Sequence, residues 1–92
     1  MDSFNVVKIL LENGANIEAV DGDGDTALIC ASRYNYINTI ELLLSEGANM
    51  EAKNNRGDTF LHYLGNEPPP KIRKAIEKNY EIRNSNIKPV KR

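Results

Sequence analysis

Apolar residues recur along the chain at the spacing of an α-helix face. The first stripe is Phe4, Val7, Leu10 and Leu11, and the second is Ile37, Ile40, Leu43 and Leu44. Positions separated by three or four residues lie on one side of a helix. Each stripe is followed by a glycine, which suits the left-handed backbone at a helix C-terminus. The pattern predicts two amphipathic helices, one over about residues 3–13 and one from Ile37 towards Gly47.

A shorter helix is predicted between these two, over Ala27–Tyr34. Asp25 or Thr26 is a favourable N-cap, because a short polar side chain can accept a hydrogen bond from the first turn. Leu28 and Ala31 lie one turn apart and should face inward. Asn35 tolerates positive φ, so it is expected to end this helix.

The chain also repeats itself with a shift of 33 residues, which places Gly14 on Gly47. Eleven of the twenty residues in 9–28 are identical to their counterparts in 42–61. A repeat of this length is one supersecondary unit that must stack on its neighbours to bury its apolar face. The sequences Asp-Gly-Asp-Gly at 21–24 and Asn-Asn-Arg-Gly at 54–57 are typical of tight turns. We therefore expect two loops, or fingers, to project side by side.

The repeated unit resembles the ankyrin repeat, which opens with an Asp or Asn turn followed by Gly-x-Thr-Pro-Leu-His and closes with Leu-Leu-x-x-Gly-Ala. The matching residues are Asp21, Gly24, Thr26, Leu28, Ala31, Leu43, Leu44, Gly47 and Ala48, then Asn54, Gly57, Thr59, Leu61 and His62. The departures are Ala27 and Phe60 in place of Pro, Ile29 in place of His, and Asn35 in place of Gly. The resemblance implies an all-α stack of about two and a half helix-turn-helix repeats with projecting hairpin-like loops.

This resemblance sets the expected domain organisation. An ankyrin repeat domain over 1–80 would comprise a half repeat at 4–19, a full repeat at 21–53 and a degenerate C-terminal capping repeat at 54–80. Proline is well tolerated at a helix start, so the last helix is predicted over about Pro70–Lys78, with Asn79 in the place of the terminal glycine. Residues 81–92 are predicted to be a basic, disordered tail.

The first unit keeps only its second helix, so apolar residues that include Val6 and Ile9 lack the helix that should cover them. Two explanations stay open at this stage. The chain is a fragment of a longer ankyrin array, or another surface covers this side, and self-association through the uncapped N-terminal helix is one such arrangement.

The composition indicates where in the cell the chain is expected to be located. The single cysteine, Cys30, excludes an intramolecular disulfide, and Asp2 and Lys8 interrupt what would be the apolar core of a signal peptide. No apolar run approaches the roughly 20 residues that span a bilayer. We expect an intracellular location, cytoplasmic or nuclear, and no membrane partner.

Charge is distributed unevenly along the chain. Residues 1–70 carry four Lys or Arg and eleven Asp or Glu, whereas residues 71–92 carry eight and two. An acidic segment 1–70 followed by a basic segment 71–92 bears on which partners the chain can bind rather than on which fold it adopts. Residues 71–92 therefore provide an alternative hypothesis, in which the basic tail binds nucleic acid or an anionic surface.

The candidates for chemistry are few. Asp21, Asp23 and Asp25 alternate as in a calcium loop, but Thr26 and Ser32 stand where such a loop needs Gly and Glu, which favours a turn. His62 is interpreted as a packing residue, and Cys30 as an inert thiol with no basic neighbour in sequence. We expect no enzyme activity, no cofactor and no metal.

The remaining hypothesis is recognition of a protein partner. In ankyrin repeats the partner is usually held by the finger tips and the exposed side of each first helix, which together make a concave face. The resemblance places these positions at Val20, Gly22, Asp23, Asp25, Arg33, Tyr34, Lys53, Asn55, Arg56, Asp58, Asn66 and Glu67. Arg33 and Tyr34 are the expected anchors, because Arg and aromatic residues dominate binding energy when they are desolvated. Tyr36 and Tyr63 are expected to extend this surface.

Overall fold

The structure is a computed structural model that describes the backbone of residues 4–87 and the side chains of residues 4–83. Within this range the regular structure is helical and contains no strand. The helices are α1 (Phe4–Glu12), α2 (Ala27–Arg33), α3 (Ile37–Ser45), α4 (Phe60–Leu64) and α5 (Pro70–Ile87).

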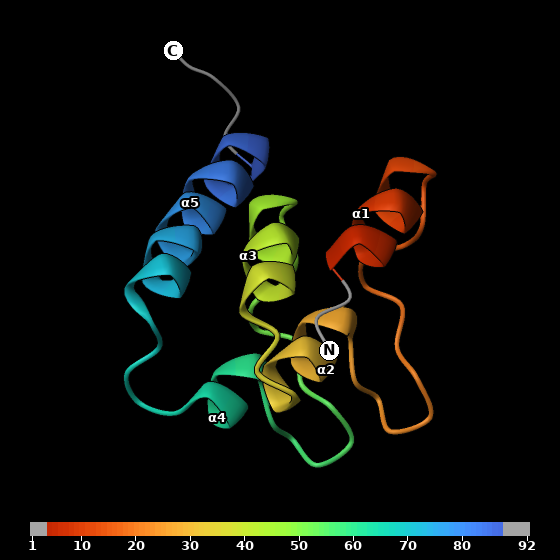
Figure 1. Ribbon diagram of the computed structural model, residues 1–92, viewed down its shortest axis with the longest axis vertical. Coiled ribbons are helices and arrows are strands. Elements are labelled where there is room, and N and C mark those ends of the chain that lie inside the picture. The colour runs from red at the N-terminus through yellow and green to blue at the C-terminus, as the bar shows by residue number, and fades with distance from the viewer. Residues whose placement is uncertain (1–3, 88–92) are drawn as a thin grey trace.

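The helices form two rows (Figure 1). One row consists of α1, α3 and α5, with α3 packed between the other two, and the second row consists of α2 packed beside α4. Helix α2 also packs on α3, which joins the rows. The loops that precede α2 and α4 project on the side away from the longer row. The predicted all-α stack with projecting loops is confirmed.

The ends of the helices follow the local sequence. Thr26 caps α2, and its Oγ1 accepts a hydrogen bond from Ile29 N at 3.2 Å. Asn35, after α2, has a φ of 60°. Gly14 and Gly47, after α1 and α3, have φ values of 88° and 87°. These positions carry the residue types that tolerate a left-handed backbone, so the predicted helix ends are confirmed.

The core is built from the predicted helix faces. Leu28 and Ala31 of α2 are 2% and 4% exposed, and Ile40, Leu43 and Leu44 of α3 are fully buried. Each such aliphatic side chain contributes about 1.5–3 kcal/mol when it is transferred from water. Phe60 of α4 and Ile72 and Ala75 of α5 complete the same cluster.

Helix α1 departs from this pattern. Val7 and Leu11 pack against the core, as expected, but Leu10 is 53% exposed. The prediction that Leu10 faces inward is therefore wrong. Its counterpart Leu43 is buried because α3 has a neighbouring helix on each side and α2 beneath it, whereas α1 packs on α3 alone among the described helices.

Helix α5 is longer than predicted. It continues to Ile87, so the expected end at Lys78, the role of Asn79 as a left-handed terminus, and the predicted disorder of 81–87 are wrong. Asn79 is fully buried, and its Nδ2 donates hydrogen bonds to the carbonyl oxygens of Leu44 at 2.9 Å and Ala48 at 3.0 Å. One turn later, Arg83 Nη1 donates to Gly47 O at 2.7 Å. The extra turns of α5 thus donate hydrogen bonds to carbonyl oxygens in the last turn of α3 and just after it. The prediction for 88–92 lies outside the described residues.

Candidate protein-binding surface

The two fingers, residues 16–25 and 49–58, end in the same kind of turn. In the first, Gly24 N donates to Asp21 O at 3.0 Å and Asp21 N donates to Asp25 O at 3.1 Å. In the second, Gly57 N donates to Asn54 O at 2.9 Å and Asn54 N to Asp58 O at 3.0 Å. The expected hairpin-like turns are therefore present and closed by matching backbone hydrogen bonds.

The finger tips lie side by side and are bonded to each other. Asn55 N donates to Asp23 O at 3.0 Å, and Asn55 Nδ2 donates to Gly22 O at 3.3 Å. The backbone of Gly24 in the first finger lies against Asn55 in the second. A Cβ added at Gly24 would lie 2.9 Å from Asn55 N. The tips therefore form one continuous surface rather than two independent loops.

We define the finger face as the two tips together with the exposed parts of α2, α4 and the loop after α4. Nine of the twelve predicted contact residues are exposed on it: Val20, Gly22, Asp23, Tyr34, Lys53, Asn55, Arg56, Asn66 and Glu67. Lys53 also borders a hollow of about 500 Å³ shared with Leu61, Ile76 and Tyr80.

The other three predicted contact residues belong to a polar network between the repeats. Asp25 is 5% exposed, so the expectation that it projects from a finger is wrong. Arg33 Nη2 lies 2.7 Å from Asp25 Oδ2, and Asn54 Nδ2 donates to Asp25 Oδ1 at 2.9 Å. The Arg33 guanidinium also lies 4.8 Å from the centre of the Tyr63 ring. A buried carboxylate needs such partners, since an unpaired one would be strongly destabilising.

Asp58 is at the other end of this network. It accepts a hydrogen bond from Tyr63 Oη at 3.0 Å, while the Tyr63 oxygen in turn accepts from Asn54 Nδ2 at 3.0 Å. His62 stacks edge-on to the Tyr63 ring and places Nε2 3.7 Å from Asp58 Oδ2. The contacts of His62 are those of the expected packing residue.

The network also changes the electrostatics of Arg33. Desolvation lowers the pKa of Arg33, but the Asp25 carboxylate, the Tyr63 phenol and the Asp25 hydrogen bond together raise that pKa above its ordinary value. Arg33 is thus a charged residue that joins the two repeats, because it pairs with Asp25 of its own repeat and contacts Tyr63 of the next. Tyr34 is a better candidate for an anchor, because it is 62% exposed and stacked on Tyr36 with 5.7 Å between ring centres.

Asp21, Asp25 and Cys30 offer ligand atoms within 4.8 Å of one another. Asp21 Oδ1 already accepts from Asp23 N at 2.9 Å and Asp25 N at 3.0 Å, so it acts as the turn residue that the sequence favoured. Burial, followed by the negative charges of Asp21, Asp25 and Asp23, raises the pKa of the Cys30 thiol. A thiol with a raised pKa is a poor nucleophile at neutral pH, which agrees with the interpretation of Cys30 as inert.

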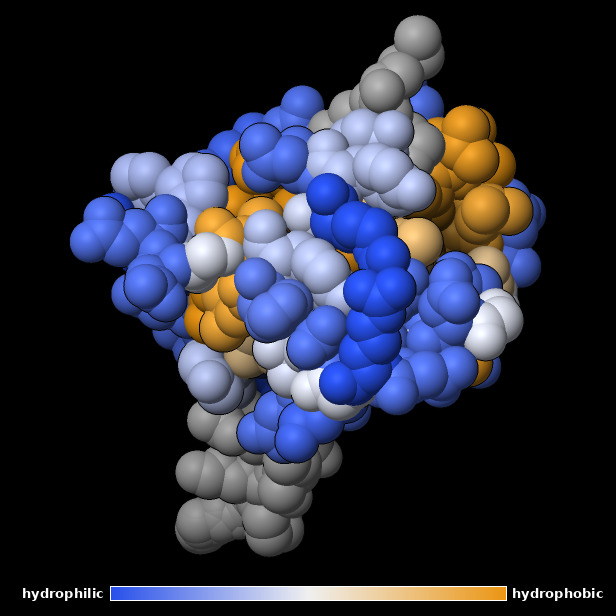
Figure 2. All heavy atoms as spheres, turned by 90° about the horizontal axis from the view of Figure 1, so that it is seen from below, coloured by the Kyte–Doolittle hydropathy of each residue, from blue (hydrophilic) through white to orange (hydrophobic). Residues whose placement is uncertain are grey.

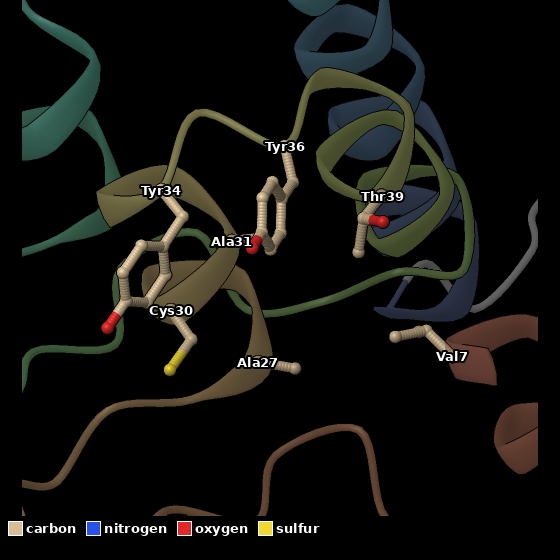
Figure 3. A pocket seen from close by; sticks show the side chains of 7 residues that line it. All are labelled: Val7, Ala27, Cys30, Ala31, Tyr34, Tyr36 and Thr39. Carbon is tan, nitrogen blue, oxygen red and sulfur yellow. The ribbon is translucent and has the colours of Figure 1, made fainter. Parts of the chain in front are cut away.

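An apolar slot of about 260 Å³ opens between α1 and α2 (Figure 3). Val7 reaches towards it from α1, while Ala27 and Cys30 line it from α2 and Tyr34 and Tyr36 from the turn that follows α2. Figure 2, which views the molecule from the side of the finger tips, shows apolar surface gathered at two opposite sides with hydrophilic residues between. The exposed apolar residues on the side of α1 include Val6, Ile9 and Leu10.

The family assignment rests on a match over nearly the whole chain. A family model described as ankyrin repeats in three copies matches residues 2–82. The chain belongs to the ankyrin repeat family. Ankyrin repeats are generally protein–protein interaction modules and are typically non-catalytic. No curated protein matches the chain at a significant level.

In this ankyrin repeat protein, none of the helices in the described range is long and apolar enough to cross a membrane. Helix α5 uses two of its cations within the fold, since Lys71 Nζ lies 3.4 Å from Glu41 Oε1 and Arg83 binds Gly47 O. Arg73, Lys74 and Lys78 are exposed on the same helix.

Sequence reasoning missed the roles of Asn54 and Tyr63 in the ankyrin repeat interface. The sequence predicts Asn54 as a turn residue and Tyr63 as part of the outer surface. Asn54 does form the turn, and in addition both residues bind the buried Asp25 or its partner Arg33. One signal was present in the sequence. Asn54 stands at the position of Asp21 one period earlier, so a hydrogen-bond donor replaces an acceptor there.

Proposed function

We propose that this ankyrin repeat protein binds a protein partner through the finger face. The observation that carries the proposal is the pairing of the two finger tips by Asn55, which presents exposed residues of both repeats as one fixed surface. A preformed surface loses less conformational entropy on binding than mobile loops would. The polar network beneath supports the same surface, because Asn54 and Tyr63 of the repeat at 54–80 contact Asp25 and Arg33 of the repeat at 21–53.

The anchors of this proposed surface are Tyr34 and Arg56. Tyr34 is exposed and held by stacking on Tyr36, and Arg56 is exposed at the tip of the second finger. Aromatic and guanidinium groups carry disproportionate binding energy when a partner removes them from water. Arg33 acts instead as a supporting residue, since its guanidinium is paired with Asp25.

Affinity capture tests the proposal with the double variant Tyr34→Ala, Arg56→Ala. Partners recovered by the wild-type chain should be lost or reduced at least tenfold, while Tyr80→Ala, an exposed aromatic on α5, should recover them at wild-type levels. Far-UV circular dichroism establishes that each variant is folded. Equal recovery of the same partners by the double variant would refute the finger face as the binding surface.

Nucleic-acid binding by α5 is a second candidate function, favoured by the exposure of Arg73, Lys74 and Lys78 on one helix. Binding to phosphates would weaken steeply with salt. Fluorescence anisotropy with single-stranded RNA and duplex DNA at low salt decides between the candidates. Binding that disappears in Arg73→Gln, Lys74→Gln and persists in the finger-face double variant would favour α5, and no binding at low salt rules it out.

A further inference from the structure

The slot between α1 and α2 lies beside α2, at the end of the shorter row of helices. In the described range, α3 packs on a helix of the shorter row, namely α2, whereas α1 and α5 each pack on α3 alone. Figure 3 shows the side chains that line the slot, with Val7 on one side and Ala27, Cys30 and Tyr34 on the other. The slot is therefore an open apolar surface between α1 and α2.

Comparison with the next repeat shows what the slot lacks. Phe60 and Tyr63 of α4 stand 33 residues after Ala27 and Cys30 of α2. Phe60 is 1% exposed in the core, and the Tyr63 ring lies beneath the Arg33 guanidinium of α2. Where α4 meets α2 it brings two aromatic rings, whereas the counterpart residues Ala27 and Cys30 offer the slot only a methyl and a thiol, beside the rings of Tyr34 and Tyr36 that follow α2. An occupant of the slot must therefore supply the bulk itself, as a large apolar side chain.

The charge beside the slot also differs from the charge at the matching position of the next repeat. Asp21 and Asn54 shape identical turns, since Asn54 Oδ1 also accepts from Arg56 N at 2.9 Å and Asp58 N at 3.0 Å. Asn54 then uses Nδ2 to donate to the carboxylate of the preceding finger. Asp21 has an oxygen in that place, which accepts only a weak hydrogen bond from the Cys30 thiol at 4.0 Å and, when ionised, cannot donate. The preferred neighbour of Asp21 is thus a donor, and a cation is the strongest one.

The surroundings strengthen this preference for a cation. Asp21 Oδ2 lies 4.0 Å from Cys30 Sγ, which lines the slot, and Asp23 is exposed in the same turn. Arg33 is already paired with Asp25. The apolar slot therefore has an acidic rim.

We propose that this slot binds a short basic amphipathic helix of a partner protein. An apolar side chain the size of Leu or Phe enters beside Ala27 and Cys30, and a Lys or Arg of the helix pairs with Asp21. Helix α2 spans seven residues, so two turns of partner helix are sufficient to cover it. The surface lies at the edge of the stack beside the first finger, shares Tyr34 with the finger face, and extends the proposed function to a second binding site.

The probe for this proposal is a synthetic 15-residue peptide with Leu at positions i, i+3, i+4 and i+7 and Lys or Arg elsewhere. Its control has the same composition in scrambled order, so that the leucines no longer share a helix face. A second control replaces the Lys and Arg residues by Glu. Fluorescence anisotropy with the full chain should show the basic amphipathic peptide binding at least tenfold more tightly than either control.

Two variants locate the binding within the slot. Ala27→Trp, at an exposed position that begins α2, should fill the slot and abolish binding. Asp21→Asn should weaken binding about tenfold while keeping the turn, because Asn54 forms the same turn with an amide. Glu77→Gln removes an exposed carboxylate on α5 and should leave the affinity unchanged.

Several outcomes would overturn the proposal. Equal binding of the scrambled peptide, unchanged affinity in folded Ala27→Trp, or no binding to the wild-type chain at millimolar concentration would each refute it. Sedimentation velocity addresses the rival occupant: a wild-type dimer that Ala27→Trp converts to a monomer would assign the slot to a second copy. Arg56→Ala alone keeps Tyr34, which lines both surfaces, and should not affect peptide binding. Loss of captured partners in Arg56→Ala with peptide binding retained therefore separates the finger face from the slot.

Discussion

Helices α1 and α3 share one sequence pattern but differ in how far their apolar side chains are buried. Leu10 and Leu43 are repeat-matched, each followed by Leu and then by Gly four residues on, yet Leu10 is 53% exposed and Leu43 is fully buried. No residue of α1 is buried, whereas α3 buries Thr39, Ile40, Leu43 and Leu44. The amphipathic stripe therefore specifies which face is available for burial, but the number of neighbouring helices decides how much of that face is buried.

The comparison also teaches where the stack is open. The α3 side chains meet α2, α1 and α5, so the middle repeat is a closed core. Around α1 the same kind of residue leaves an apolar slot and an exposed strip. In a repeat protein whose units contact only their neighbours, an edge of this kind is the natural place for another molecule to add.

The largest expected contrast is between Leu43→Ala and Leu10→Ala. Leu43→Ala leaves a cavity in the core and should reduce the free energy of unfolding by about 2–5 kcal/mol. Leu10→Ala removes a half-exposed side chain and should cost less than about 1.5 kcal/mol. Urea denaturation followed by circular dichroism measures both.

If Leu43→Ala does not fold, Ile40→Val serves as the milder core variant, with an expected loss of about 0.5–1.5 kcal/mol. Equal losses for Leu10→Ala and Leu43→Ala would mean that the outer side of α1 is covered in solution, and the contrast between the two helices would not hold.

A second prediction sharpens the contrast at the other end of the stack, where Asn79 stands in the position of Gly47. If α5 ended at Asn79, glycine there would be harmless. Because Asn79 lies inside α5 and bonds the carbonyls of Leu44 and Ala48, Asn79→Gly should cost about 2–4 kcal/mol through lost hydrogen bonds and lower helix propensity. Urea denaturation provides the value, and Lys78→Gly, exposed on the same helix, controls for propensity alone. A cost no larger than that of Lys78→Gly argues against the continuous helix.

The third prediction compares the two fingers. Gly24 and Gly57 have φ values of 78° and 81°, so alanine is strained at both and should cost about 1–2 kcal/mol. Gly24 has the additional contact with Asn55 N, whereas nothing lies within 4 Å of an added Cβ at Gly57. Gly24→Ala should therefore be the more destabilising by roughly another 1 kcal/mol, measured by thermal unfolding. Indistinguishable melting temperatures would indicate that the finger tips are not in contact.

The smallest expected effect concerns Cys30, the counterpart of Tyr63. Since the folded-state pKa of the thiol is raised above its ordinary value of 9.0, its contribution to stability is complete below that pH and is lost as the pH rises through the folded pKa. The wild-type chain should therefore lose slightly more stability than Cys30→Ala between pH 8 and roughly pH 10. Parallel urea denaturation of both chains measures the difference. A thiol that reacts faster with iodoacetamide in the folded than in the unfolded chain would contradict the raised pKa.

Much of the fold was predictable from local chemistry. The helix faces of α2 and α3, the caps at Thr26 and Asn35, and the turns at the finger tips depend on residues a few positions apart, and the 33-residue period implied that the units stack. The exposed finger positions followed from the same alignment. These features are local, or repeat a local feature, so the order of the residues contains them.

The rest depended on contacts between distant parts of the chain. Asp25 is buried because Arg33, Asn54 and Tyr63 surround it, and Asn79 continues a helix because its amide meets the end of α3. Leu10 remains exposed although Leu43 is buried, since burial is a property of the neighbours and not of the residue. The amino-acid sequence by itself determined the repeating helical unit and its available faces, whereas the tertiary structure alone decided which faces are covered, because covering a surface and pairing a buried charge both require a second segment in place.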